Sequence, residues 1–167
     1  MHAHQIVPPI SSTKKKKPVT VDFYQTIEES LRLMGAHGVH HLVVLQGDKV
    51  YGVVSDRDIY QTWTRFGIEK ASLMSVGHSC TPSPCLTPRS SLKEAVDLMV
   101  ELQCSGICIA DDEKPIGIMT TTDMVRILYR TLDDNYKTEP DVIRRGQVAL
   151  SHPLMVNLMQ IVSEAGI

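Results

Sequence analysis

The sequence has no apolar run long enough to cross a lipid bilayer. None of its 167 residues belongs to a stretch approaching the ~20 apolar residues of a membrane helix. Residues 1–10 also have no apolar core resembling that of a signal peptide. We therefore expect a cytoplasmic protein with no membrane partner. The length suits one compact domain or a fused pair of small repeats.

An excess of one charge sign is also lacking. The chain has 17 basic and 19 acidic residues and a net charge of −2, so no global field attracts nucleic acid or an anionic membrane. The local exception is a run of four lysines at residues 14–17. Such a run is usually a solvated arm, although it could reach a ligand's phosphates or an acidic partner surface. No aromatic residues interleave with it, which disfavours nucleic acid as a partner.

Cysteine is scarce, and its spacing does not predict a metal site. Cys104 and Cys108 fall in or beside an apolar strand pattern, where a thiol acts as a small buried hydrophobe, and we expect the thiols to be reduced. His78, Cys80 and Cys85 lack the spacing of a zinc knuckle. We predict no metal and no obligatory cofactor.

What the sequence does contain is an internal duplication. Residues 26–60 align without a gap with residues 91–125, at a constant offset of 65 (91 − 26 = 65). Most apolar positions stay apolar between the two copies. The identical pairs are Glu29/Glu94, Leu33/Leu98, Met34/Met99, Lys49/Lys114, Gly52/Gly117 and Asp58/Asp123.

Each copy begins with a predicted helix followed by a predicted hairpin. Thr26-x-x-Glu29 is a capping box that marks a helix start, and Ser91-x-x-Glu94 repeats it. Apolar residues then recur at helical spacing in both copies. Two β-rich runs separated by a polar turn predict a hairpin. They lie at 42–45 and 50–54 in the first copy, and at 107–110 and 115–119 in the second.

A second helix follows each hairpin, at about 56–66 and 121–132, and a short strand precedes each first helix, at 19–21 and 85–87. The predicted fold is therefore α+β, built from two tandem β-α-β-β-α repeats. Pro82, Pro84 and Pro88 favour extended backbone between the repeats. The predicted segments are an arm with the lysines (1–17), the first repeat (18–68), a linker with the first strand of the second repeat (69–88), the second repeat (89–132) and an extension (133–167). The extension is predicted to end in an amphipathic helix, marked by Leu154, Leu158, Ile161 and Val162.

A Gly-x-x-Ser/Thr-x-x-Asp motif joins each hairpin to its following helix. Helix capping alone would explain the hydroxyl and the aspartate. It would not require a glycine three residues earlier, where a missing side chain lets a flat ligand approach the backbone. An aspartate at a helix start can also accept both hydroxyls of a ribose, while free amides reach toward phosphate. The motif residues are Gly52, Ser55 and Asp58 in the first copy, and Gly117, Thr120 and Asp123 in the second.

With these motifs, residues 18–130 resemble the cystathionine-β-synthase (CBS) domain family, whose paired repeats form a pseudo-two-fold disc called a Bateman module. The resemblance implies an adenosine ligand, AMP, ADP or ATP and sometimes S-adenosylmethionine, in the cleft between the repeats. It implies that Asp58 and Asp123 contact ribose, and that Ser55 and Thr120 contact phosphate or ribose.

Two further residues are candidates for the first site. The segment from His40 and His41 into the strand resembles the family segment that often lines the adenine pocket or reaches phosphate, and its counterpart begins at Ser105. Ordinary half-exposed packing of His41 is the alternative. Arg57 is placed to reach phosphate where the second copy has Thr122, so the first site is expected to be the stronger one.

The sequence predicts regulation without catalysis. Each candidate catalytic group already belongs to a helix cap or to the ribose motif. With no effector domain in the sequence, we expect action in trans on an unidentified protein. The alternative is a ligand-free scaffold for protein interaction. In either case a homodimer is expected, because Met34, Met99 and Leu128 suggest apolar helix faces left uncovered.

Overall fold

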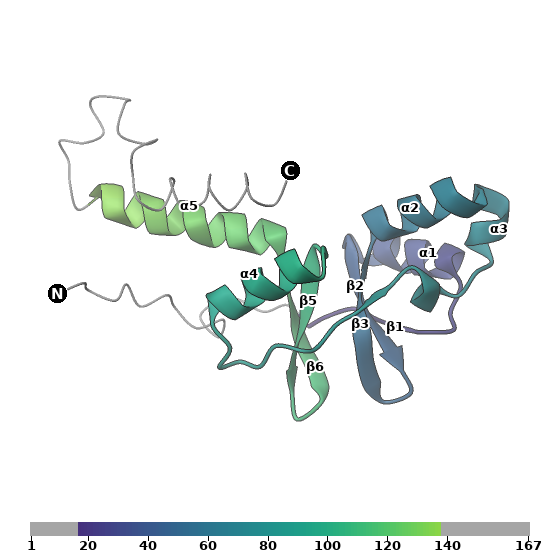
Figure 1. The fold of residues 1–167 in the computed structure, drawn as a ribbon, viewed down its shortest axis with the longest axis horizontal. Coiled ribbons are helices and arrows are strands. Elements are labelled where there is room, and N and C mark those ends of the chain that lie inside the picture. The colour runs from purple at the N-terminus through teal and green to yellow at the C-terminus, as the bar shows by residue number, and fades with distance from the viewer. Residues whose placement is uncertain (1–16, 138–167) are drawn as a thin grey trace. The chain divides into compact units, whose positions relative to one another are not determined.

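The chain alternates helices with β-hairpins (Figure 1), which confirms the predicted α+β class. A computed structural model describes residues 17–137, with side chains up to Tyr129. This part forms two compact units with their boundary between Thr121 and Thr122. The lysines at 14–16 and the predicted terminal helix around Leu154 lie outside the described residues.

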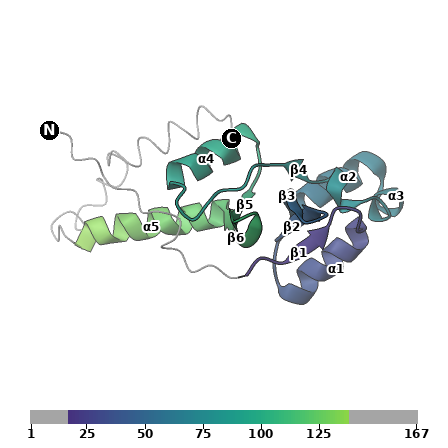
Figure 2. The same cartoon turned by 90° about the horizontal axis from the view of Figure 1, so that it is seen from below.

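The first repeat is a four-stranded sheet with three helices gathered beside it (Figures 1 and 2). The strand order is β1-β2-β3-β4, and only the β1–β2 pairing is parallel. The predicted capping box at Thr26 and Glu29 is present, and the helix ends at Gly38, whose φ of 60° suits glycine. The elements are β1 (Thr20–Asp22), α1 (Ile27–His37), β2 (His41–Gln46), β3 (Lys49–Ser55), α2 (Asp56–Phe66), α3 (Ile68–Ser72) and β4 (Thr81–Pro82).

The apolar stripe of α1 packs against the sheet, as its helical spacing predicts. Ile27 and Met34 are buried, and Leu31 packs against the same cluster. Strand residues, one residue of α2 and two residues of the segment before β4 complete this core, so it fixes α2 at the end of β3. The buried partners are Val21, Leu42, Val44, Val54, Ile59, Val76 and Cys80.

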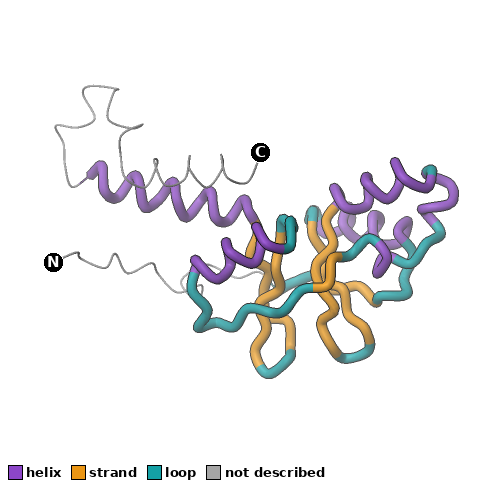
Figure 3. Tube along the Cα trace, viewed as in Figure 1, coloured by secondary structure: helices purple, strands orange, loops and turns teal. Residues whose placement is uncertain are grey.

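The second repeat keeps the helix, hairpin, helix order of the first, with a sheet of two strands, and one backbone hydrogen bond recurs at the repeat offset. Its hairpin is drawn in orange in Figure 3. The Asp56 N–H donates to the His40 carbonyl (3.2 Å), and the Thr121 N–H donates to the Ser105 carbonyl (3.0 Å), 65 residues on (56 + 65 = 121). Each hairpin also has a register shift at the equivalent place. The elements are α4 (Leu92–Glu101), β5 (Gly106–Asp111), β6 (Lys114–Thr120) and α5 (Thr121–Lys137).

The strand predicted at 85–87 is reduced to a single parallel bridge between Leu86 and Ile109. Pro84 and Pro88 flank this bridge and lack the N–H that a ladder needs, which limits its extension. The linker instead contributes β4 to the first sheet, after a short 3₁₀ helix (Val76–His78). Helix α5 ends at Lys137, later than the predicted 132.

The apolar surface differs from the one that the sequence suggests. Met34 and Met99 are only 4% and 6% exposed, so they belong to the core of a single chain and leave no face for a partner. Other large apolar side chains are exposed, namely Tyr24, Tyr60, Phe66, Ile68, Leu73, Val100, Val125 and Tyr129. Between residues 17 and 137, no helix combines the length and apolar character that a bilayer crossing demands.

Candidate functional site

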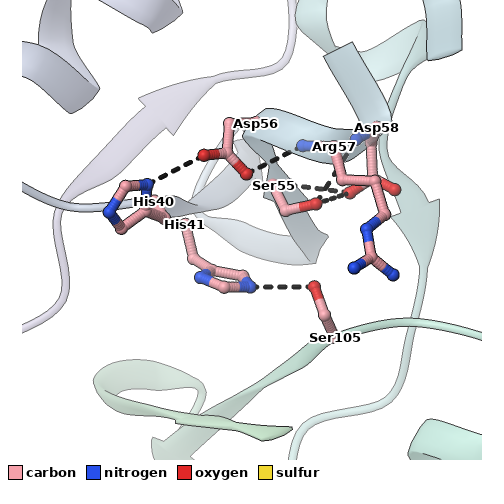
Figure 4. Close-up of polar contacts among 7 residues, drawn as sticks. All are labelled: His40, His41, Ser55, Asp56, Arg57, Asp58 and Ser105. Atoms are coloured by element: carbon pink, nitrogen blue, oxygen red, sulfur yellow. Dashed lines mark hydrogen bonds and ion pairs between the residues drawn. The ribbon is translucent and has the colours of Figure 1, made fainter. Parts of the chain in front are cut away.

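The first motif forms a complete capping box where β3 runs into α2 (Figure 4). The Asp58 N–H donates to Ser55 Oγ (3.3 Å). In return, Asp58 Oδ2 accepts hydrogen bonds from the Ser55 N–H (2.7 Å) and the Ser55 hydroxyl (2.6 Å). The capping role is therefore realised. It uses Oδ2 of the carboxylate, and Oδ1 takes no part in the cap.

Gly52 has a reason within the protein for lacking a side chain. A Cβ there would overlap the carbonyl oxygen of Thr81 in β4 and lie 3.0 Å from Cys80 Sγ. Pairing of β3 with β4 thus requires a glycine, whereas the sequence argument attributed it to an approaching ligand. Gly117 has the equivalent place in its hairpin, paired with Ile109 as Gly52 is with Val44.

The two histidines at the start of β2 make different contacts (Figure 4). His41 is half-buried, and its Nε2 lies 2.9 Å from Ser105 Oγ, so it joins the first hairpin to the turn before β5. His40 is exposed, and its Nδ1 lies 2.8 Å from Asp56 Oδ2. The sequence segment that predicts a ligand contact for His41 therefore lies where the two repeats meet.

Asp56 organises this corner, although the sequence motif does not single it out. Its Oδ2 contacts His40, and its Oδ1 accepts the Arg57 N–H (2.8 Å). Arg57 is exposed, and its guanidinium projects away from the first turn of α2 (Figure 4). The available signal was an acidic residue at the first helical position, where a carboxylate interacts favourably with the helix dipole.

Two thiols, those of Cys80 and Cys104, lie close enough to Asp58 for its negative charge to raise their pKa values. Burial, with smaller contributions from Asp58 and Cys104, raises the pKa of Cys80 to about 12. The pKa of Cys104 is also raised, by burial first and by Asp58, against a backbone hydrogen bond at Gly106 that lowers it. Both thiols are therefore protonated neighbours of the carboxylate near neutral pH. Sequence reasoning missed them, because their proximity depends on distant segments meeting.

The second motif occupies the equivalent elements. Thr120 ends β6, and Asp123 lies in the first turn of α5. Arg126 Nη1 lies 3.6 Å from Asp123 Oδ1. Thr122 replaces Arg57 in this copy, but Arg126 supplies a cation one helical turn from Asp123. The second motif therefore also has a positive charge nearby.

Metal ligation finds no support in the part of the chain from 17 to 129. There, no group of three or more His, Cys, Asp or Glu side chains is placed to hold an ion.

Known proteins resemble this chain in sequence and fold. The family model described as the CBS domain matches residues 11–62 and 76–130. The CBS domain-containing protein YhcV of Bacillus subtilis is 30% identical over 115 residues, which cover 69% of this chain and 81% of that protein. Among solved structures, the CBS domain pair of MJ0100 in complex with 5′-methylthioadenosine and S-adenosyl-L-methionine has a TM-score of 0.63 and 18% identity, covering 75% of this chain and 98% of that one. CBSX2 in complex with AMP has a TM-score of 0.53 and 27% identity, covering 69% and 92%.

Proposed function

The chain belongs to the CBS-domain family, and we propose that it is a regulatory module that binds an adenosine nucleotide at the start of α2. The carrying observation is the Asp58 carboxylate, whose Oδ2 completes the helix cap while Oδ1 stays outside it. One carboxylate can thus serve the fold and still accept a ribose hydroxyl. Two similar structures hold adenosine compounds, 5′-methylthioadenosine with S-adenosyl-L-methionine in one and AMP in the other.

The proposed site places each group by its chemistry. Asp58 accepts ribose hydroxyls, the Ser55 hydroxyl lies toward phosphate, and Arg57 adds a charge-assisted contact to the same phosphate. The first amides of α2 take no part, because those of residues 56–58 already donate within the protein. His41 and Gly52 line the site from the hairpin. For the second copy, the assignment of Gly117, Thr120 and Asp123 stands on the sequence motif alone.

The proposed mode of action is regulation in trans. A nucleotide that binds one arrangement of the repeats better than another shifts the population toward it, and a partner protein detects that shift. We propose that the protein is not an enzyme and works in the cytoplasm. A homodimer would cover exposed apolar side chains such as Ile68 (63% exposed) and Leu73 (75%), and light scattering should then report about twice the chain mass.

The rival function is a ligand-free interaction scaffold, favoured by the complete capping box and by the internal reason for Gly52. Thermal melting with AMP, ADP, ATP and S-adenosylmethionine separates the two functions. Binding to the folded state alone raises the melting midpoint with the logarithm of ligand concentration. A midpoint that none of the four compounds moves would favour the scaffold. Mass spectrometry of the small molecules that survive purification tests the ligand without a prior choice.

A further inference from the structure

Cys85 and Cys108 face each other where the linker touches β5. The Leu86 N–H donates to the Cys108 carbonyl (2.8 Å), and the Ala110 N–H donates to the Leu86 carbonyl (2.8 Å). These two bonds make the parallel bridge between Leu86 and Ile109. One residue back along both segments, the same parallel register sets Cys85 opposite Cys108, with their side chains on one face.

The first repeat supports this register independently. There, Thr20 of β1 pairs with Val43 of β2. At the repeat offset of 65, the equivalent positions in the second repeat are Cys85 and Cys108 (20 + 65 = 85, 43 + 65 = 108). Adjacent strands lie about 4.8 Å apart, a separation at which opposed residues fall within the Cα–Cα range of a disulfide.

The two thiols are in contact and differ in exposure. Their side chains share a hydrogen bond. Cys108 is fully buried in a cluster with Val43 and Val53, whereas Cys85 packs against this cluster and is half-buried. A reagent from solvent can therefore reach Cys85 first, whereas Cys108 is accessible only to Cys85 within the protein.

The hydrogen bond also makes the two thiols chemically unequal. It lowers the pKa of Cys85 to about 7, against an opposing effect of burial. The same bond, together with burial, raises the pKa of Cys108. Cys85 therefore has a larger thiolate fraction near neutral pH than an ordinary cysteine, and the thiolate is the form that attacks electrophiles.

We propose that Cys85 and Cys108 form a reactive dithiol, a covalent modification site in which Cys85 attacks low-molecular-weight disulfides and Cys108 resolves the product. The Cys85 thiolate attacks one sulfur of the disulfide, forms a mixed disulfide and releases one small thiolate. The Cys108 thiol then gives its proton to solvent and attacks Cys85 Sγ, which breaks the mixed disulfide and releases the second small thiolate. The two cysteines are oxidised to one disulfide, and the reagent is reduced to two thiols. The linker is then covalently tied to β5.

The test uses the full chain and Ellman's reagent, an aromatic disulfide that releases a coloured thiolate at each step. We expect a fast phase that releases two coloured thiolates per chain, a product lighter by two hydrogen atoms, and a peptide map that joins Cys85 to Cys108. At pH 7, Cys85 should react at least roughly fivefold faster than Cys104, because its larger thiolate fraction outweighs the lower nucleophilicity of a more acidic thiol.

The first repeat suggests the variants, since Thr20 and Val43 occupy the equivalent positions. Cys85→Thr should abolish the fast phase. Cys108→Val should release one coloured thiolate in that phase and retain the label on Cys85, and Cys108→Ala provides the same readout if the valine does not pack. Cys104→Ala is the matched control, because Cys104 is also half-buried but has a raised pKa, and it should behave as wild type. A fast phase that survives Cys85→Thr, or a wild-type product that keeps the label on Cys85, would overturn the proposal.

Discussion

His41 and Gly106 occupy equivalent positions of the two repeats (41 + 65 = 106) and lie against each other. A Cβ built on Gly106 would stand 2.9 Å from His41 Cδ2 and 3.3 Å from Val53 Cγ1. Where equivalent positions of a duplicated fold meet, there is room for one large side chain. The first repeat supplies it, and His41 then reaches Ser105 beyond the glycine.

Gly106→Ala should therefore destabilise the protein by about 1 to 3 kcal/mol through overpacking. The loss should shrink in a His41→Ala background, because the clashing ring is gone and the two changes are coupled. Chemical denaturation of the four proteins in this cycle measures the coupling. Gly35→Ala is the control, since its Cβ meets nothing within 4 Å and should not destabilise. Additive effects at 106 and 41 would contradict the contact.

Asp58→Asn should harm ligand binding more than folding. Asparagine keeps an acceptor oxygen for the Ser55 cap, so the ligand-free protein should lose no more than ~1 kcal/mol. Nucleotide affinity should fall by ~1.5 to 3 kcal/mol, or about ten- to a hundredfold, because charge-assisted bonds to ribose are lost. Calorimetry and melting of the ligand-free variant measure the two effects.

The matched control for this change is Asp97→Asn, which alters an exposed carboxylate of α4 that pairs with Lys93. Its nucleotide affinity should equal that of wild type. Asp123→Asn should weaken binding less than Asp58→Asn if the second motif is the weaker site. Unchanged affinity in both motif variants would leave Asp58 and Asp123 as helix caps.

Alkylation of Cys85 by iodoacetamide should accelerate as the pH rises through about 7 and then level off, because the thiolate is the reactive form and the Cys108 hydrogen bond lowers the pKa to that value. In Cys108→Val that bond is absent, so the midpoint should move to higher pH. Peptide-resolved mass spectrometry across a pH series provides both curves. Coincident midpoints would mean that Cys108 does not control the acidity of Cys85.

Cys80 should make the folded protein sensitive to alkali. Its pKa is raised from 9.0 to about 12 in the folded state, so above pH 9 the unfolded chain releases this proton first. The contribution of this group to stability is unchanged below pH 9 and is lost as the pH rises toward 12, at ~1.4 kcal/mol per pH unit. Cys80→Ala should show a shallower decline of unfolding free energy above pH 9, measured against wild type. Parallel curves would contradict it.

Local signals in the sequence were enough to predict the repeated elements. Three capping boxes mark the starts of α1, α2 and α4, because hydroxyl, carboxylate and backbone amides lie within one turn of each other. Short β-rich runs separated by a polar turn likewise mark both hairpins. The duplication is visible in the residue order itself, at a constant offset of 65, and requires no knowledge of the fold.

Tertiary structure decided which residues meet across these elements. The overlap of Gly52 with β4, the contact from His41 to Ser105 and the facing thiols of Cys85 and Cys108 all join segments far apart in the chain. Met34 and Met99 look like surplus apolar surface in the sequence, yet they complete the core once the helices pack. Residue spacing predicts the capping hydrogen bonds and the apolar face of a single helix or strand. Burial and long-range contacts depend instead on how these elements pack against one another in three dimensions.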